Sequence, residues 1–391
     1  QMCIRDSHET DREDSFLFSD FYKAHRAMNR ASHRTPASYY EYGLDYLYED
    51  VRRYYMTLIE EALDTFDMDG LELDWMREIY SIGIGREYEG TAVINAFMRE
   101  VFARVKTAEQ KWGHPIRIAV RLPDTPEKCL RLGFDFFDWV NAGLVDLITV
   151  TPRWSSIDNN MPIDLWKKIL ADKPVELAAG LEILIDAYNR RGRKYWNNTY
   201  ETAIASACAY HSMGADAIYL FNYMDAVEPS SDKDDSLYSD REIYHKFLCT
   251  AGSYEGSAAQ PRRHVVTYDD VYAVSVPGAR QLPLRLSGER GRPTPFSALR
   301  IVTGKIPAGR TVHAVLGFAR GTVHIENVTV YLNAKKCRLA GSAKPVYPQY
   351  EDMEYFIFEA ENDGALPPVS VLEVGISEGE TAVHWAEIDI L

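Results

Sequence analysis

Residues 69–77 read DGLELDWMR, a stretch in which apolar and acidic side chains alternate as they do on a β-strand. Successive side chains of an extended chain point to opposite faces, so the two leucines share one face while Glu72 and Asp74 share the other. In a closed barrel of parallel strands, one face packs under helices and the other points into the lumen. A barrel therefore explains why a strand with an apolar face also carries carboxylates.

Between residues 50 and 223, helical patterns alternate with short apolar runs, which is typical of repeated βα units. We predict parallel, adjacent strands in this order near residues 70–75, 116–122, 145–151, 175–182 and 217–223. A doubly wound sheet also fits five such units, but no glycine-rich phosphate loop follows any of them. The predicted fold class is therefore α/β, a (β/α)8 TIM barrel of which these are the last five strands.

The first residues, QMCIRDS, resemble a translated sequencing-adapter remnant of the kind found in metagenomic assemblies. We expect residues 1–7 to be non-native and residues 8–255 to form a barrel domain that lacks its first strands. An export signal would have been lost with that missing N-terminus. Localisation therefore stays open, with the periplasm and the extracellular space both allowed.

The sequence changes character after residue 225. Residues 226–264 are polar and rich in helix breakers, as expected of a final helix and a linker. Residues 265–391 contain many short β-type runs separated by Gly, Pro and Asp, a spacing that indicates an antiparallel β-sandwich. This domain shows no obvious row of Trp or Tyr for sugar binding, so we expect it to support the barrel.

Composition excludes some classes of partner. The 391 residues are 46% hydrophobic and 26% charged, an ordinary globular balance, and the formal net charge is −15. Nucleic acids and anionic membranes need a basic surface, and no apolar run is long enough to span a bilayer. The histidines and the five cysteines lack metal-site spacing, so we predict no metal and no other cofactor.

Four motifs together carry a resemblance to a known family. They are DGLELDWMR, GLVDLITVTPRW, LAAGLE and GADAIYLFNY, each at a predicted strand end. They resemble uncharacterised glycoside-hydrolase-like (β/α)8 proteins of environmental bacteria, in which a barrel is followed by a C-terminal β-sandwich. The resemblance implies a carbohydrate substrate without naming the sugar.

Two carboxylates are the expected catalytic pair. Asp74 ends the strand numbered four in the full barrel, Glu182 ends strand seven, and both have lumen parity. Glycoside hydrolysis needs one carboxylic acid to protonate the leaving oxygen and one carboxylate to attack or to activate water. By analogy with retaining glycosidases that use these strand ends, Asp74 is the acid/base and Glu182 the nucleophile. That clan usually ends strand four in Asn-Glu and this chain in Leu-Asp, so reversed roles or inversion stay open.

Aromatic and polar residues near the strand ends are expected to contact the sugar, because aromatic rings suit the apolar C–H surface of a pyranose. The expected substrate-binding residues are Glu72, Trp75, Arg77, Arg121, Trp154, Asn222 and Tyr223. Arg121 and Arg77 also fit a salt bridge to Asp74. Glu72, one layer deeper in the lumen, also fits a buried partner that tunes the pKa of Asp74.

Two other functions are weighed against glycoside hydrolysis. A lyase or isomerase with Glu72, Asp74 and Glu182 as Mg²⁺ ligands would need a basic Lys or His at the rim, and no Lys stands at the five strand ends. A non-catalytic carbohydrate-binding protein with a degenerate barrel is the other alternative. The sugar, its linkage, the stereochemical outcome and the oligomeric state are not set by the sequence.

Overall fold

The computed structural model describes residues 19–30, 43–76, 79–152, 156–185, 196–221, 223, 237, 240–267, 281–343, 352–364 and 366–391. The described residues divide into two compact units. The first holds the described residues up to 152 together with 168–178, and the second holds 156–167, 179–267 and 281–391. No helix within these ranges is long and apolar enough to cross a membrane.

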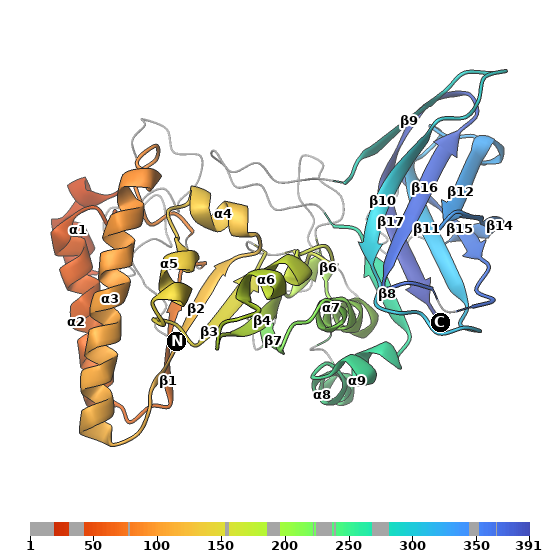
Figure 1. Ribbon diagram of the computed structural model, residues 1–391. Helices are drawn as coiled ribbons and strands as arrows, with labels where there is room; N and C mark the ends of the chain where they lie inside the picture. The colour runs from red at the N-terminus through yellow and green to blue at the C-terminus, as the bar shows by residue number, and fades with distance from the viewer. Residues whose placement is uncertain are drawn as a thin grey trace. The chain divides into compact units, whose positions relative to one another are not determined.

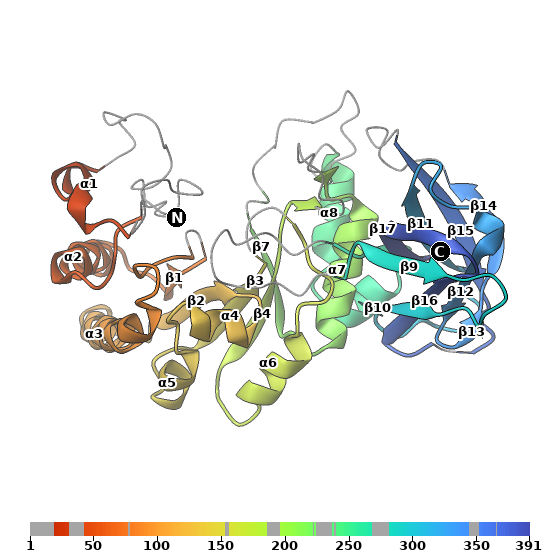
Figure 2. The same ribbon diagram turned by 90° about the horizontal axis from the view of Figure 1, so that it is seen from above.

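The first unit contains helices and parallel strands in alternation (Figure 1). Its elements are α1 (Asp20–Ala24), η1 (Arg26–Met28), α2 (Glu49–Thr65), β1 (Gly70–Asp74), α3 (Glu87–Trp112), β2 (Arg117–Pro123), α4 (Pro126–Arg131), α5 (Phe136–Asn141) and β3 (Leu147–Thr151). The two long helices lie side by side, as Figure 2 shows. The Trp112 indole N–H fixes this pair by donating to the carbonyl of Leu63 at 2.9 Å.

Five parallel strands form the main sheet, in the order β1-β2-β3-β4-β7. The last two are β4 (Glu176–Leu181), which begins in the first unit and ends in the second, and β7 (Ala217–Leu220). The predicted strands, their adjacency and their order are thereby confirmed. Closure into an eight-stranded barrel goes beyond this sheet and stays a prediction.

The apolar periodicity of the sequence explains how these elements pack. On β2, the alternate residues Ile118, Val120 and Leu122 are at most 2% exposed, which is the expected pattern for a strand face covered by helices. Helix α3 ends where Gly113 adopts a left-handed conformation at φ 81°, a conformation that only glycine reaches without steric penalty. The chain then enters β2 four residues later.

The second unit joins the later βα elements to the C-terminal strands. Its remaining elements up to residue 265 are α6 (Ile163–Leu170, shared with the first unit), β5 (Leu184–Ile185), β6 (Trp196–Asn197), α7 (Tyr200–Ser212), α8 (Arg241–Thr250), α9 (Tyr254–Ala258) and β8 (Arg262–Val265). Helix α7 is apolar on nearly every side and packs against β7, α8, α9 and β8. A reciprocal capping box between Thr199 and Thr202 starts the helix.

Two antiparallel sheets occupy the region for which the sequence predicts a β-sandwich. The four-stranded sheet has the order β10 (Phe296–Val302), β16 (Val369–Ile376), β12 (Val328–Leu332), β13 (Lys335–Lys336). The six-stranded sheet has the order β14 (Arg338–Ala343), β15 (Met353–Ala360), β11 (Val312–Ala319), β17 (Gly379–Ile390), β8, with β9 (Leu284–Gly288) paired to β17. A short 3₁₀ turn, η3 (Ile325–Asn327), precedes β12. The first strand, β8, starts three residues before the predicted boundary at 265.

A cluster of charged side chains lies on one face of the six-stranded sheet. Glu387 and Asp389 are two residues apart on β17 and so share this face. Arg263 of β8 approaches their carboxylates at 2.7 and 3.7 Å respectively. On the other side of β17, His313 of β11 lies opposite Asp389 in the strand register. Burial, with the nearby Glu387 charge, raises the pKa of Asp389 to about 8, against the opposing effect of Arg263. Between pH 3.8 and about 8, Asp389 therefore keeps a proton in the folded protein that it would release in the unfolded chain.

We expect the stability of the protein to fall as the pH rises. The pKa of Asp389 is raised from 3.8 to about 8 in the folded protein. The stability that its protonated carboxyl group contributes is therefore fully present below pH 3.8 and is lost as the pH rises through about 8. The melting temperature of the wild-type protein, measured across this window, should therefore drop. Asp389→Asn should remove much of the drop, since an amide does not titrate, whereas Asp363→Asn at an exposed aspartate should not. An undiminished drop in Asp389→Asn would contradict this assignment.

Candidate active site

One face of the parallel sheet carries a row of polar residues along β1, β2 and β3. The parallel pairing places Asp74 of β1 beside Arg121 of β2, and Arg121 beside Thr149 of β3. Arg121 Nη1 donates to both carboxylate oxygens of Asp74, at 3.0 and 3.2 Å. The backbone N–H of Met76 donates to Asp74 Oδ1 at 2.9 Å. Three hydrogen bonds therefore fix the orientation of the Asp74 carboxylate.

Asp74 and Arg121 differ in their access to solvent. The Arg121 side chain is 1% exposed, whereas that of Asp74 is 31% exposed. The salt bridge that we gave as the alternative role for Asp74 is thus present. Because the carboxylate stays partly exposed, the bridge leaves Asp74 open to a ligand. Arg121 is therefore placed to position Asp74.

Glu72 and Trp75 occupy different places from those expected. Glu72 shares the face of Asp74, but its side chain is exposed and not buried one layer deeper, because β1 comes first in the strand order. Trp75 is 5% exposed. Its ring lies in an aromatic cluster with Tyr46, Phe97, Phe134 and Trp139. Packing between the sheet and the helices therefore uses the Trp75 ring that we expected to stack on a sugar.

Glu182 follows β4 directly and is 1% exposed. Its backbone carbonyl accepts hydrogen bonds from Asn198 Nδ2 at 2.5 Å and from the Tyr223 hydroxyl at 3.3 Å. Tyr223 is itself buried, with its ring stacked 5.9 Å from that of Phe247. The contacts of Tyr223 therefore hold the backbone at Glu182 in place, a role different from the sugar stacking that we expected.

Three further predicted substrate-binding residues lie outside the described residues. They are Arg77, Trp154 and Asn222. Their roles stay predictions. Among the described residues, no group of three or more His, Cys, Asp or Glu side chains is arranged to hold a metal ion.

A buried ion pair that the sequence analysis does not predict lies at the end of β2. Asp124 follows the strand, and Lys128 on α4 donates to both of its carboxylate oxygens at 2.9 Å. Both side chains are at most 5% exposed. The sequence has no Lys directly at the predicted strand ends, but the start of α4 brings Lys128 back to the end of β2. The sequence signal for this ion pair is the i, i+4 spacing of Asp124 and Lys128 across the start of the helix.

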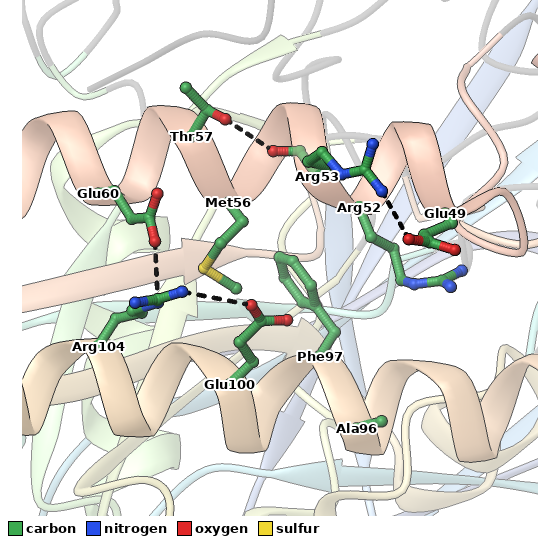
Figure 3. Close-up of a pocket in the computed structure, with 10 residues that line it drawn as sticks. All are labelled: Glu49, Arg52, Arg53, Met56, Thr57, Glu60, Ala96, Phe97, Glu100 and Arg104. Carbon is green, nitrogen blue, oxygen red and sulfur yellow. Dashed lines mark hydrogen bonds and ion pairs between the residues drawn. The ribbon is translucent and has the colours of Figure 1, made fainter.

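A pocket of about 480 Å³ is lined by residues of α2 and α3, which Figure 3 shows. Three arginines and three glutamates line it, and ion pairs join Arg53 to Glu49 at 2.6 Å and Arg104 to Glu60 at 2.8 Å. Arg52 donates to the carbonyls of Tyr46 and Leu47. Of these contacts, the Arg104–Glu60 pair joins α3 to α2, and the others lie within α2 or link it to the residues just before it. We do not assign the substrate to this pocket.

Solved structures of known proteins resemble this chain only weakly. No protein-family model matches the chain, and no curated protein does. A multi-modular cell-surface chitinase of Paenibacillus sp. is 12% identical, with 86% of this chain and 41% of that chain covered and a TM-score of 0.36. A chitinase of Bacillus thuringiensis is 9% identical, with 85% and 76% covered and a TM-score of 0.36.

A third neighbour is the GH30 xylanase C catalytic domain of Talaromyces cellulolyticus, which is 12% identical, with 83% and 67% covered and a TM-score of 0.29. These three solved structures are glycoside hydrolases. This chain spans less than half the length of the Paenibacillus enzyme. All three TM-scores are below 0.5.

We expect the Asp124–Lys128 pair to be needed for stability. Lys128→Met would leave a buried carboxylate without its cation and should lower the free energy of unfolding by about 3 to 5 kcal/mol. The double variant Asp124→Asn, Lys128→Met should lose much less unfolding free energy than the sum of the losses in the single variants Asp124→Asn and Lys128→Met.

The matched control for this prediction lies on the same helix. Arg131 and Glu127 have the same i, i+4 spacing on α4, but their side chains are 49% and 69% exposed. Arg131→Met should change the unfolding free energy by less than about 1 kcal/mol. Denaturant titration measures all four variants, and equal losses at Lys128 and Arg131 would show that burial does not make the first pair important.

Proposed function

We propose that this chain is a glycoside hydrolase with Asp74 and Glu182 as its carboxylate pair. The observation that carries the proposal is the placement of two acidic residues at strand ends of one parallel sheet. Asp74 ends β1 and Glu182 follows β4. Parallel strands carry their carboxyl ends to the same edge of a sheet, the edge at which barrel enzymes bind substrate. A carbohydrate is the substrate class.

The environments of the two carboxyl groups support different roles. The partial exposure of Asp74 suits a group that exchanges protons with the leaving oxygen and with water, and Arg121 and the Met76 N–H orient its carboxylate. Glu182 is buried on a backbone held by Asn198 and Tyr223, which suits a nucleophile that must keep a fixed position.

The proposed reaction retains the anomeric configuration. Glu182 attacks the anomeric carbon and forms a glycosyl ester, while Asp74 gives its proton to the departing oxygen. Asp74 then takes a proton from water, whose oxygen attacks the same carbon and releases Glu182. Retention requires the two carboxyl groups to lie about 5 Å apart, whereas inversion requires about 6.5 to 9.5 Å. Arg77, Trp154 and Asn222 are proposed to contact the sugar, with Glu72 on the same face as Asp74.

Carboxamide variants test the pair. On oligosaccharides of glucose, xylose, N-acetylglucosamine and galactose, Asp74→Asn and Glu182→Gln should each lower kcat by about two orders of magnitude or more, without loss of cooperative melting. The control is Glu176→Gln on β4, an exposed residue paired with Arg117 at 3.1 Å, which should keep wild-type turnover. NMR of the first-formed product anomer reports retention or inversion. Near-normal turnover in either carboxamide variant would remove that residue from the pair.

One observation favours the second candidate function, a non-catalytic carbohydrate-binding protein. The Asp74–Arg121 ion pair is a contact that a purely structural carboxylate would also make. On this alternative, the wild-type protein binds oligosaccharides without cleaving them. Binding by calorimetry together with the absence of new reducing ends would select it.

A further inference from the structure

The four-stranded sheet of the C-terminal region has two different faces. Its inward side chains are apolar and buried, among them Leu299, Leu372 and Val330. Its other side, which we call the outer face, combines aromatic, aliphatic and charged groups. The outer face consists of Phe296, Arg300, Tyr331, Lys336, Val371 and Glu373, which come from all four strands of the sheet.

Two aromatic rings meet on the outer face across a glycine. Phe296 of β10 pairs with Gly375 of β16, and Tyr331 of β12 pairs with Glu373 of the same strand. Because Gly375 has no side chain, the two rings approach to 5.3 Å between centroids at an angle of 78°. A Cβ at Gly375 would lie 2.9 Å from the Phe296 ring. The glycine is therefore needed for this aromatic contact.

The aromatic contact leaves apolar surface open to solvent. Phe296 is 41% exposed and Val371 is 38% exposed, and the two lie on the neighbouring strands β10 and β16. A ring over a strand glycine also helps to fix strand register. That structural role explains why Phe296 covers Gly375, but it gives no reason for the charged groups gathered around the rings.

The charges of the outer face are not used in ion pairs within the described residues. In the strand register, Lys336 of β13 lies opposite Tyr331 of β12, and Arg300 of β10 lies opposite Val371 of β16. Both cations are exposed, whereas Glu373, the acidic residue between them, is half-buried. The outer face is thus locally cationic on a chain whose formal net charge is −15. Such a surface complements an anionic ligand.

We propose that the outer face binds an acidic polysaccharide. Phe296 and Tyr331 contact the apolar C–H surfaces of sugar rings, and Arg300 and Lys336 pair with carboxylate or sulfate groups along the chain. Four strands about 4.8 Å apart span about 14 Å, which gives room for a short run of sugar rings. This binding is independent of hydrolysis, so it holds whether or not Asp74 and Glu182 are catalytic.

The test measures binding of the whole protein to polygalacturonate, an acidic polymer, and to neutral β-1,4-galactan by affinity gel electrophoresis. The wild-type protein should bind polygalacturonate, and added salt should weaken the binding. Tyr331→Ala and Lys336→Glu should each raise the dissociation constant at least about tenfold. Lys336 is exposed, so Lys336→Glu keeps the test decisive if Tyr331→Ala melts early.

Two matched controls separate this face from general surface effects. Phe137 on α5 is 40% exposed, and Phe137→Ala, which removes an aromatic ring outside the outer face as Tyr331→Ala removes one within it, should bind like the wild-type protein. Lys305→Glu makes the same charge reversal at an exposed lysine outside the outer face and should also bind normally.

Three results would overturn the proposal. The first is equal binding of the neutral polymer, or no binding of the acidic one. The second is wild-type affinity in both Tyr331→Ala and Lys336→Glu. The third is a wild-type dimer in sedimentation that Phe296→Ala dissociates, which would assign the outer face to a second copy of the chain.

Discussion

The alternation of side chains along parallel strands is the constraint on which the first unit depends. Ile118, Val120 and Leu122 leave water on one face of β2, and the same geometry forces Arg121 onto the other face. A buried guanidinium needs a partner, and the register supplies Asp74 on the neighbouring strand. The orientation of the candidate catalytic carboxylate thus follows from apolar burial on the opposite side of the sheet.

Ion pairs with buried carboxylates join neighbouring elements in both units. Asp124 and Lys128 join the end of β2 to α4, while Arg263 and Glu387 join β8 to β17. Removing such groups from water costs several kcal/mol each, so they persist only where the partner is held rigidly nearby. Short sequence separation provides this rigidity in the first pair and strand pairing provides it in the second.

Within the second unit, β8 connects the helices to the C-terminal sheets. The Asn159 amide donates to the carbonyl of Val265 at 2.9 Å, and Arg262 donates to the carbonyls of Ala258 and Thr303 at 2.7 and 3.5 Å. Helix α7 packs on the same strand. These contacts fit the support role expected for the C-terminal region, and the outer face of the four-stranded sheet adds a binding role to it.

The sequence by itself determined the five strands, their order, and the shared face of Glu72 and Asp74, because strand periodicity is a local property. It also offered the Arg121 salt bridge as one of two readings of Asp74. The burial of Trp75 and Tyr223, the exposure of Glu72 and the return of Lys128 to a strand end depend on which elements pack nearby. Phe296 and Tyr331 become neighbours only through their pairing with β16. Cross-strand register is set by the packing of whole sheets, and no window of sequence contains it.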